Sequence, residues 1–80
     1  MSTKLHVGNI ASTVEANDLR AKFLQYGPVE TVEIAKYADS GLRKGFAIVA
    51  MAYDQDADTA IKSLNFTQYA GRTIGVSRAR

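Results

Sequence analysis

The hydrophobic residues of this chain recur at two different spacings, which predict an alternation of strands and helices. Leu5 and Val7 lie two residues apart, as do Ile74 and Val76, and this is the spacing of one face of a β-strand. Two further short segments are rich in β-branched and other apolar residues, which favours strands over helices. The four predicted strands are residues 4–9, 29–35, 45–52 and 72–77.

Two other segments carry apolar side chains at spacings of three and four residues, the repeat of one helix face. The apolar faces are Ala16, Leu19, Phe23 and Tyr26 in residues 14–26, and Ala57, Ala60, Ile61 and Leu64 in residues 54–64. Ser12 or Thr13 is placed to cap the first helix, which Gly27 and Pro28 should end. Acidic residues near the start of both segments suit the positive end of a helix dipole. Both segments are therefore predicted to be amphipathic helices.

The predicted order of elements is strand, helix, strand, strand, helix, strand. Right-handed crossovers would place both helices on one face of a four-stranded antiparallel sheet. The expected fold class is α+β, of the ferredoxin-like βαββαβ type, and residues 1–80 are expected to form a single domain. The sheet face opposite the helices is left open, and a binding site is expected there.

Alternation along the strands predicts which side chains this open face presents. If Leu5 and Val7 face the helices, His6 faces the opposite side, and Phe46 and Ile48 of the third strand share its direction. The other outward positions are Thr31, Glu33, Lys44, Ala50, Gly75 and Ser77. An aromatic ring exposed in the middle of a sheet costs hydrophobic free energy unless a ligand covers it, and a nucleobase covers it well by stacking.

The composition narrows the class of protein without identifying a ligand. The 80 residues are 46% hydrophobic, which fits a folded chain, and the net charge of +2 is too small to indicate a nucleic-acid partner by itself. The absence of cysteine excludes disulfides and thiolate metal sites, and no apolar segment is long enough to span a bilayer. An intracellular, cytoplasmic protein without a membrane partner is expected, and a nuclear location fits the same features.

The distribution of charge is more informative than its total. Several basic residues fall outside the predicted helices, whereas many acidic residues fall in them or at their starts. The side of the molecule opposite the helices should therefore be the more basic one, and we expect phosphate contacts at the margins of the open face. The basic residues expected to make them are Lys36, Arg43, Lys44, Arg78 and Arg80.

Two short motifs on the first and third predicted strands resemble those of the RNA recognition motif (RRM) family. Residues 5–10 read LHVGNI, and residues 44–51 read KGFAIVAM, which is similar to the family pattern K/R-G-F/Y-G/A-F-V-x-F/Y. The resemblance extends over essentially the whole chain. It implies that single-stranded RNA is bound by stacking, with phosphate contacts beside the stacked bases. The RNA-contacting residues that it implies are His6, Phe46 and Ile48 for stacking, Lys44 for phosphate, and Asn9.

The stacking positions depart from the family pattern in a way that bears on affinity. Only Phe46 keeps the aromatic ring, since His6 is a smaller stacker and Ile48 cannot stack as a ring can. A weak-to-moderate binder of about two or three nucleotides is therefore expected. Tyr37, in the loop between the second and third strands, is a further candidate RNA contact.

A protein-interaction domain is the alternative to an RNA-binding module. Ile48 and Ala50 make the expected open face more aliphatic, and an apolar patch can recruit a peptide or a second copy of the chain. RNA remains the expected ligand, a protein partner is the second candidate, and the domain itself is expected to be a monomer.

The sequence contains no clear catalytic or metal-binding constellation. Residues 54–58 resemble the start of a calcium-binding loop, but Thr59 and Asn65 occupy the positions where that loop requires Gly and Glu. His6 is the only histidine, and no nucleophile elbow is present. We therefore expect a protein that is not an enzyme and that holds no metal and no cofactor.

Overall fold

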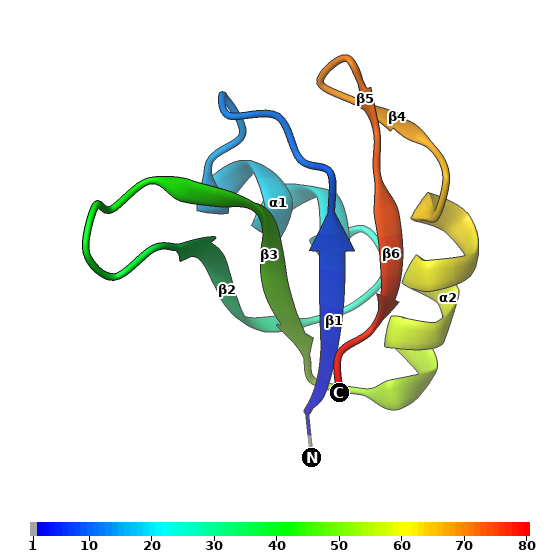
Figure 1. Cartoon of the computed structure of the whole chain (residues 1–80). Helices are drawn as coiled ribbons and strands as arrows, with labels where there is room; N and C mark the ends of the chain where they lie inside the picture. The colour runs from blue at the N-terminus through cyan, green and yellow to red at the C-terminus, as the bar shows by residue number, and fades with distance from the viewer. Residues whose placement is uncertain (1) are drawn as a thin grey trace.

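The computed structural model describes residues 2–80, whose elements follow the predicted order except that the last strand is divided (Figure 1). The helices are α1 (Ala16–Leu24) and α2 (Asp54–Leu64). The strands are β1 (Thr3–Gly8), β2 (Val29–Lys36), β3 (Arg43–Met51), β4 (Gln68–Tyr69), β5 (Arg72–Thr73) and β6 (Gly75–Arg78). Neither helix in this part of the chain is both long and apolar enough to cross a membrane.

Within the described residues, four strands form an antiparallel sheet in the order β2-β3-β1-β6. Strand β1 lies between β3 and β6, with Leu5 opposite Val49 and Val7 opposite Val76. Both helices lie on one side of this sheet, and Figure 1 views the molecule from the other side. The expected α+β fold with an open sheet face is therefore confirmed.

The hydrophobic core lies between the sheet and the two helices. Leu5, Val7 and Val49, which alternation directs toward the helices, are fully buried, and so are Leu19 and Phe23 of α1. Burial of apolar surface stabilises the fold by about 25 cal/mol per Å². Because these strand residues point toward the helices, the side chains of the residues between them point to the opposite, open face of the sheet.

The segment predicted as one last strand, residues 72–77, is divided in two. Ala70 and Gly71 have backbone φ angles of 52° and 84°, and two successive positive φ angles produce a tight hairpin turn. This turn folds β5 back on β4, so only the residues after Ile74 join the four-stranded sheet. The sequence did not indicate the hairpin because alanine is uncommon at positive φ.

Helix α1 begins later than predicted, and a different residue caps it. Glu15 is the N-cap in place of Ser12 or Thr13. The Asp18 carboxylate accepts a hydrogen bond of 2.8 Å from the backbone N–H of Glu15, which satisfies an amide at this end of the helix. Val14 is buried in the preceding loop, so its apolar side chain contributes to the core without being helical.

Candidate nucleic-acid interface

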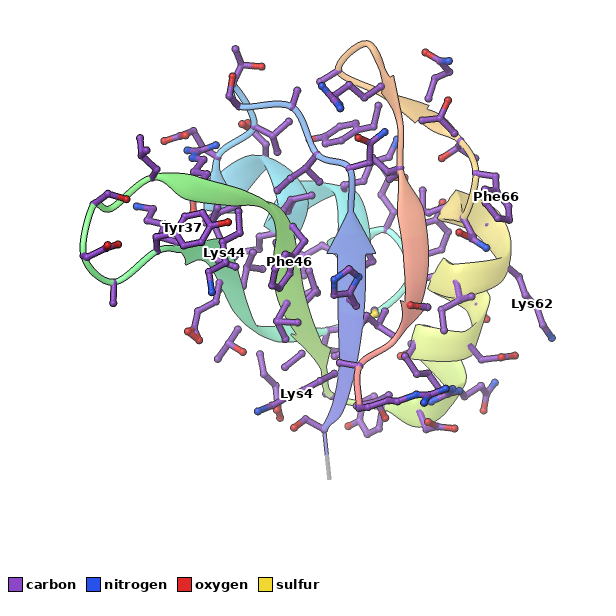
Figure 2. The ribbon with its side chains drawn as sticks, in the orientation of Figure 1. Lys4, Tyr37, Lys44, Phe46, Lys62 and Phe66 are labelled. Atoms are coloured by element: carbon purple, nitrogen blue, oxygen red, sulfur yellow. The ribbon has the colours of Figure 1, made fainter. Side chains whose placement is uncertain are left out.

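An aromatic pair lies at the centre of the open face. The rings of His6 and Phe46 stack with their centroids 4.7 Å apart and their planes inclined by 24°. His6 lies opposite Ile48 and Phe46 lies opposite Gly8, so the two rings are diagonal neighbours on β1 and β3. Both side chains are half-buried and keep some ring surface in contact with solvent, and Figure 2 shows Phe46 on the side of the sheet that faces the viewer.

Gly8 provides the space that this stack occupies. A Cβ atom built on Gly8 would lie 3.2 Å from Cε1 of His6, which is closer than ordinary van der Waals contact. Because Gly8 also lies opposite Phe46, the missing side chain leaves room for the His6 ring beside the phenyl ring. The glycine of the first motif is therefore part of the aromatic platform.

A row of four side chains crosses the sheet through His6. Ser77 of β6 lies opposite His6, His6 lies opposite Ile48, and Ile48 lies opposite Glu33 of β2. Ile48 is half-buried, whereas Ser77 and Glu33 are exposed at the two ends of the row. The third predicted stacking position is therefore adjacent to the aromatic pair, with a polar group at either margin.

The expectation that Ala50 adds aliphatic surface to the open face is wrong. Ala50 is only 3% exposed, because in the register of the sheet it lies between the larger side chains of Lys4 and Thr31. Lys4 itself is exposed on this face and was missed as a candidate (Figure 2). The alternation that directs His6 outward does the same for Lys4, so the signal was present in the sequence.

The hairpin between β2 and β3 carries a second aromatic group beside the sheet. Nζ of Lys44 lies 5.1 Å from the centroid of the Tyr37 ring, a cation–π distance. Tyr37 is 53% exposed, and Figure 2 shows Tyr37, Lys44 and Phe46 following one another from the hairpin toward the centre of the sheet. Lys36 lies at the base of the same hairpin, opposite Arg43.

Arg43 is engaged in contacts within the fold. Its guanidinium donates hydrogen bonds to the backbone oxygens of Ser12, at 2.8 Å, and of Val14, and it forms an ion pair with Glu15. These contacts hold the loop before α1 against β3. The phosphate contact of Arg43 stays a prediction, and it would require donors that these bonds leave free.

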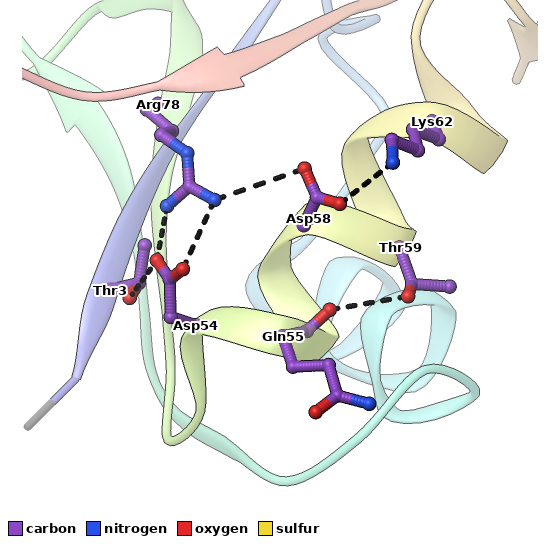
Figure 3. Close-up of polar contacts among 7 residues, drawn as sticks. All are labelled: Thr3, Asp54, Gln55, Asp58, Thr59, Lys62 and Arg78. Carbon is purple, nitrogen blue, oxygen red and sulfur yellow. Dashed lines mark hydrogen bonds and ion pairs between the residues drawn. The ribbon is translucent and has the colours of Figure 1, made fainter.

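The prediction that Arg78 lies at a margin of the open face is wrong. Arg78 lies opposite Leu5, whose side chain faces the helices, so Arg78 is on the helix side of the sheet. Its guanidinium pairs with Asp54 at the start of α2, and one of its nitrogens lies 3.9 Å from a carboxylate oxygen of Asp58. Figure 3 shows both contacts. Hydrogen bonds from Arg78 and, secondly, from the Thr3 hydroxyl lower the pKa of the Asp54 carboxyl below its ordinary value.

Asn9 connects the end of β1 to the β4–β5 hairpin. Its side-chain amide donates a hydrogen bond of 2.8 Å to the carbonyl of Thr73, and its side-chain oxygen accepts one of 3.1 Å from Nε of Arg72. Asn9 has a φ of 61°, a left-handed conformation that asparagine tolerates better than most residues. These contacts place the exposed Arg72 beside Asn9 at the end of β1. The charge pattern of the sequence did not indicate that Arg72 lies there.

The site is an exposed surface. Within residues 2–80 the structure contains neither an enclosed pocket nor a group of three or more His, Asp or Glu side chains that could hold a metal ion. The chemistry that it offers is therefore stacking on rings, packing against an aliphatic side chain and contacts from flanking ammonium groups.

Comparison with known sequences identifies a protein family that matches most of this chain. The family described as RNA recognition motif matches residues 5–75 of the chain. RNA-binding protein 4B of Homo sapiens is 43% identical over 75 residues, which make up 94% of this chain and 19% of that protein. The putative RNA-binding protein RbpD of a Nostoc species is 34% identical over 76 residues, or 95% of this chain and 81% of that protein. The chain therefore spans about a fifth of the first relative and most of the second.

Solved structures show the same arrangement of elements. The crystal structure of RNA binding protein PG1 has a TM-score of 0.93 at 32% identity, and the match covers 98% of this chain and 94% of that one. A structure described as a Sxl-lethal protein/RNA complex has a TM-score of 0.91 at 30% identity, covering 100% of this chain and 48% of that one. Together with the sequence match over nearly the whole chain, these structures show that the protein belongs to the RNA recognition motif family.

Proposed function

We propose that this domain binds short single-stranded RNA on its open sheet face, with bases seated on His6, Phe46 and Ile48. The observation that carries the proposal is the stacked His6–Phe46 pair in the middle of the sheet. A nucleobase can extend such a stack, and base–aromatic stacking contributes about 1–3 kcal/mol per base. The names of the relatives and the RNA in the Sxl-lethal complex support the same ligand.

The phosphate groups would be met by ammonium and guanidinium groups around the aromatic pair. Lys44 lies between that pair and the Tyr37 ring, and Lys4 lies toward the opposite end of the sheet. Lys36 and Arg80 are exposed and would add contacts at the margins. In this proposal Tyr37 offers a further stacking surface on the hairpin.

Asn9 and Arg43 are proposed to support the interface by positioning other groups. Asn9 holds Arg72 beside the end of β1, and Arg43 fixes the loop that follows the same strand. Their loss would then weaken RNA binding through displaced neighbours rather than through a lost phosphate contact.

The affinity should be moderate because the platform has one full aromatic stacker. Phe46 is that stacker, His6 offers a smaller ring, and Ile48 can only pack against a base or a sugar. We infer that about two or three nucleotides occupy the sheet, with the cationic margins supplying the remaining binding energy.

We propose that the domain acts by binding alone, as one monomeric unit of residues 1–80 inside the cell, without a metal or a cofactor. Membership of an RNA-binding family supports a binding role over a catalytic one. The alternative role, a protein-interaction domain with an aliphatic sheet face, loses support because Ala50 is buried. Neither the family nor the names of the relatives favour that alternative.

Substitution of Phe46 by alanine tests this proposal. The Phe46→Ala variant should bind a fluorescently labelled single-stranded RNA pentamer more weakly by about 1–3 kcal/mol, because it loses the main stacking ring. Affinity would be measured by fluorescence anisotropy, after circular dichroism has established that the variant is folded.

A matched control is available at Phe66, which is 80% exposed beyond the end of α2 (Figure 2). Phe66→Ala removes the same side chain from a place outside the proposed platform and should leave RNA affinity unchanged. Equal affinities of the wild-type protein and folded Phe46→Ala would contradict the stacking proposal.

A further inference from the structure

One carboxylate interrupts the cationic and apolar character of the open face. Glu33 on β2 lies opposite Ile48 in the register of the sheet, which places its side chain on this face beside the third stacking position. Its side chain is exposed, and the Glu33 carboxylate forms no hydrogen bond or ion pair with another side chain in the described part of the chain. A carboxylate here opposes the binding of phosphate, so its presence beside the stacking residues requires another explanation.

The position of Glu33 brings it within reach of a stacked base. Adjacent strands lie about 4.8 Å apart, and residues on a cross-strand diagonal are about 7–8 Å apart, within reach of long side chains. Glu33 is the direct neighbour of Ile48 and the diagonal neighbour of Phe46. A base stacked on Phe46 or packed on Ile48 would therefore direct one edge toward the Glu33 carboxylate.

The chemistry of a carboxylate selects among base edges. An ionised carboxylate only accepts hydrogen bonds, and its two oxygens can accept a parallel pair. The Watson–Crick edge of guanine presents two adjacent donors, N1–H and the 2-amino group. Adenine and cytosine present one amino donor beside a ring-nitrogen acceptor, and uracil presents a single N–H between two carbonyl acceptors that repel a carboxylate.

We propose that Glu33 is a specificity-determining residue that selects a guanine at the nucleotide seated on Phe46 and Ile48. This inference rests on the proposed RNA binding by the open face and adds to it the identity of one base. The guanine would stack on the platform and donate two hydrogen bonds to the Glu33 carboxylate. The phosphate of that nucleotide would lie away from β2, toward Lys4 and Lys44.

The test compares RNA pentamers that differ at the central base within a uridine background. Wild-type protein should bind the guanine probe more tightly than the all-uridine probe, by about 5- to 100-fold for a good bidentate contact. A probe with central inosine, which lacks the 2-amino group, should fall between the two. Glu33→Gln should bring the ratio of guanine to uridine affinity close to one.

Glu30→Gln is the matched control, because Glu30 is exposed on the same strand and its loss changes the net charge equally. Glu30→Gln should raise affinity for all probes by a similar factor and leave the ratio of guanine to uridine affinity unchanged. Glu33→Gln should instead weaken binding of the guanine probe relative to the uridine probe, because the bidentate contact is lost.

The outcomes separate the two proposals. If the wild-type protein binds none of the probes, RNA binding by the open face is contradicted. If it binds guanine and uridine probes equally, prefers adenine or cytosine, or keeps its guanine preference in Glu33→Gln, the role of Glu33 is contradicted while RNA binding stands.

Discussion

The contact between His6 and Phe46 depends on a third residue that has no side chain. Gly8 lies opposite Phe46, and the His6 ring occupies the space that a Cβ on Gly8 would reach. Strand alternation predicted that His6 and Phe46 share a face, since that requires only a period of two. It could not predict that the two rings stack on one another, because this depends on register and on the conformations of the side chains.

Substitution of Gly8 by alanine should weaken RNA binding with little effect on folding. The added Cβ would press on the end of the His6 side chain, which can move toward solvent, so the stability change should stay below about 1 kcal/mol. The displaced ring should reduce RNA affinity by up to about 1 kcal/mol, the lower end of a stacking contribution. Chemical denaturation and fluorescence anisotropy would measure the two effects.

A double-mutant cycle identifies the cause of that loss. If Gly8→Ala acts by displacing His6, it should have little effect in a His6→Ala background, because the displaced ring is already gone. Equal losses of RNA affinity in both backgrounds would show that Gly8 acts independently of the stack.

At the scale of elements, two arginines hold the N-terminal ends of the helices against the sheet. Arg43 on β3 binds the backbone before α1 and the Glu15 cap, and Arg78 on β6 pairs with Asp54 at the start of α2. Both arginines were expected to contact phosphate because they are basic and lie outside the helices. Alternation from Val76 already directs Arg78 to the helix side, but the charge pattern could not show which group either arginine reaches, because that contact is settled only in the packed structure.

The ion pair at the start of α2 should make part of the fold's stability depend on pH. The pKa of Asp54 is lowered in the folded state, so its stabilising contribution is present above the unfolded-state pKa of about 4 and is lost as pH falls through the folded-state pKa. The melting temperature of Asp54→Asn should therefore lie below that of the wild type at neutral pH. The gap should narrow in acid, as followed by circular dichroism.

Asp39, which is exposed in the loop between β2 and β3, provides the control for this prediction. Asp39→Asn should change the melting temperature little at either pH. A gap between Asp54→Asn and wild type that stays constant from neutral pH into acid would show that the ion pair with Arg78 does not stabilise the folded state.

At the scale of the whole molecule, hydrophobic spacing predicted both helices and two strands, and the β-branched and apolar composition of two further segments predicted the other strands. The right-handed crossover rule then predicted the open sheet face. The prediction failed where the backbone adopts conformations unusual for the residue, as at Ala70 in the hairpin that divides the last strand. It also failed for Ala50, because a small outward side chain in the middle of a sheet is covered by its larger neighbours. The location of the candidate site was therefore predictable, whereas the separation of contact residues from bracing residues required the structure.

NMR mapping tests most directly whether RNA occupies the open face of the sheet. Titration of ¹⁵N-labelled protein with a short single-stranded RNA should shift backbone amide signals in β1 and β3, especially around His6, Phe46 and Lys44. The amides of α2, on the opposite side, should change little. Shifts concentrated in the helices, or no shifts at RNA concentrations that saturate related domains, would contradict this account.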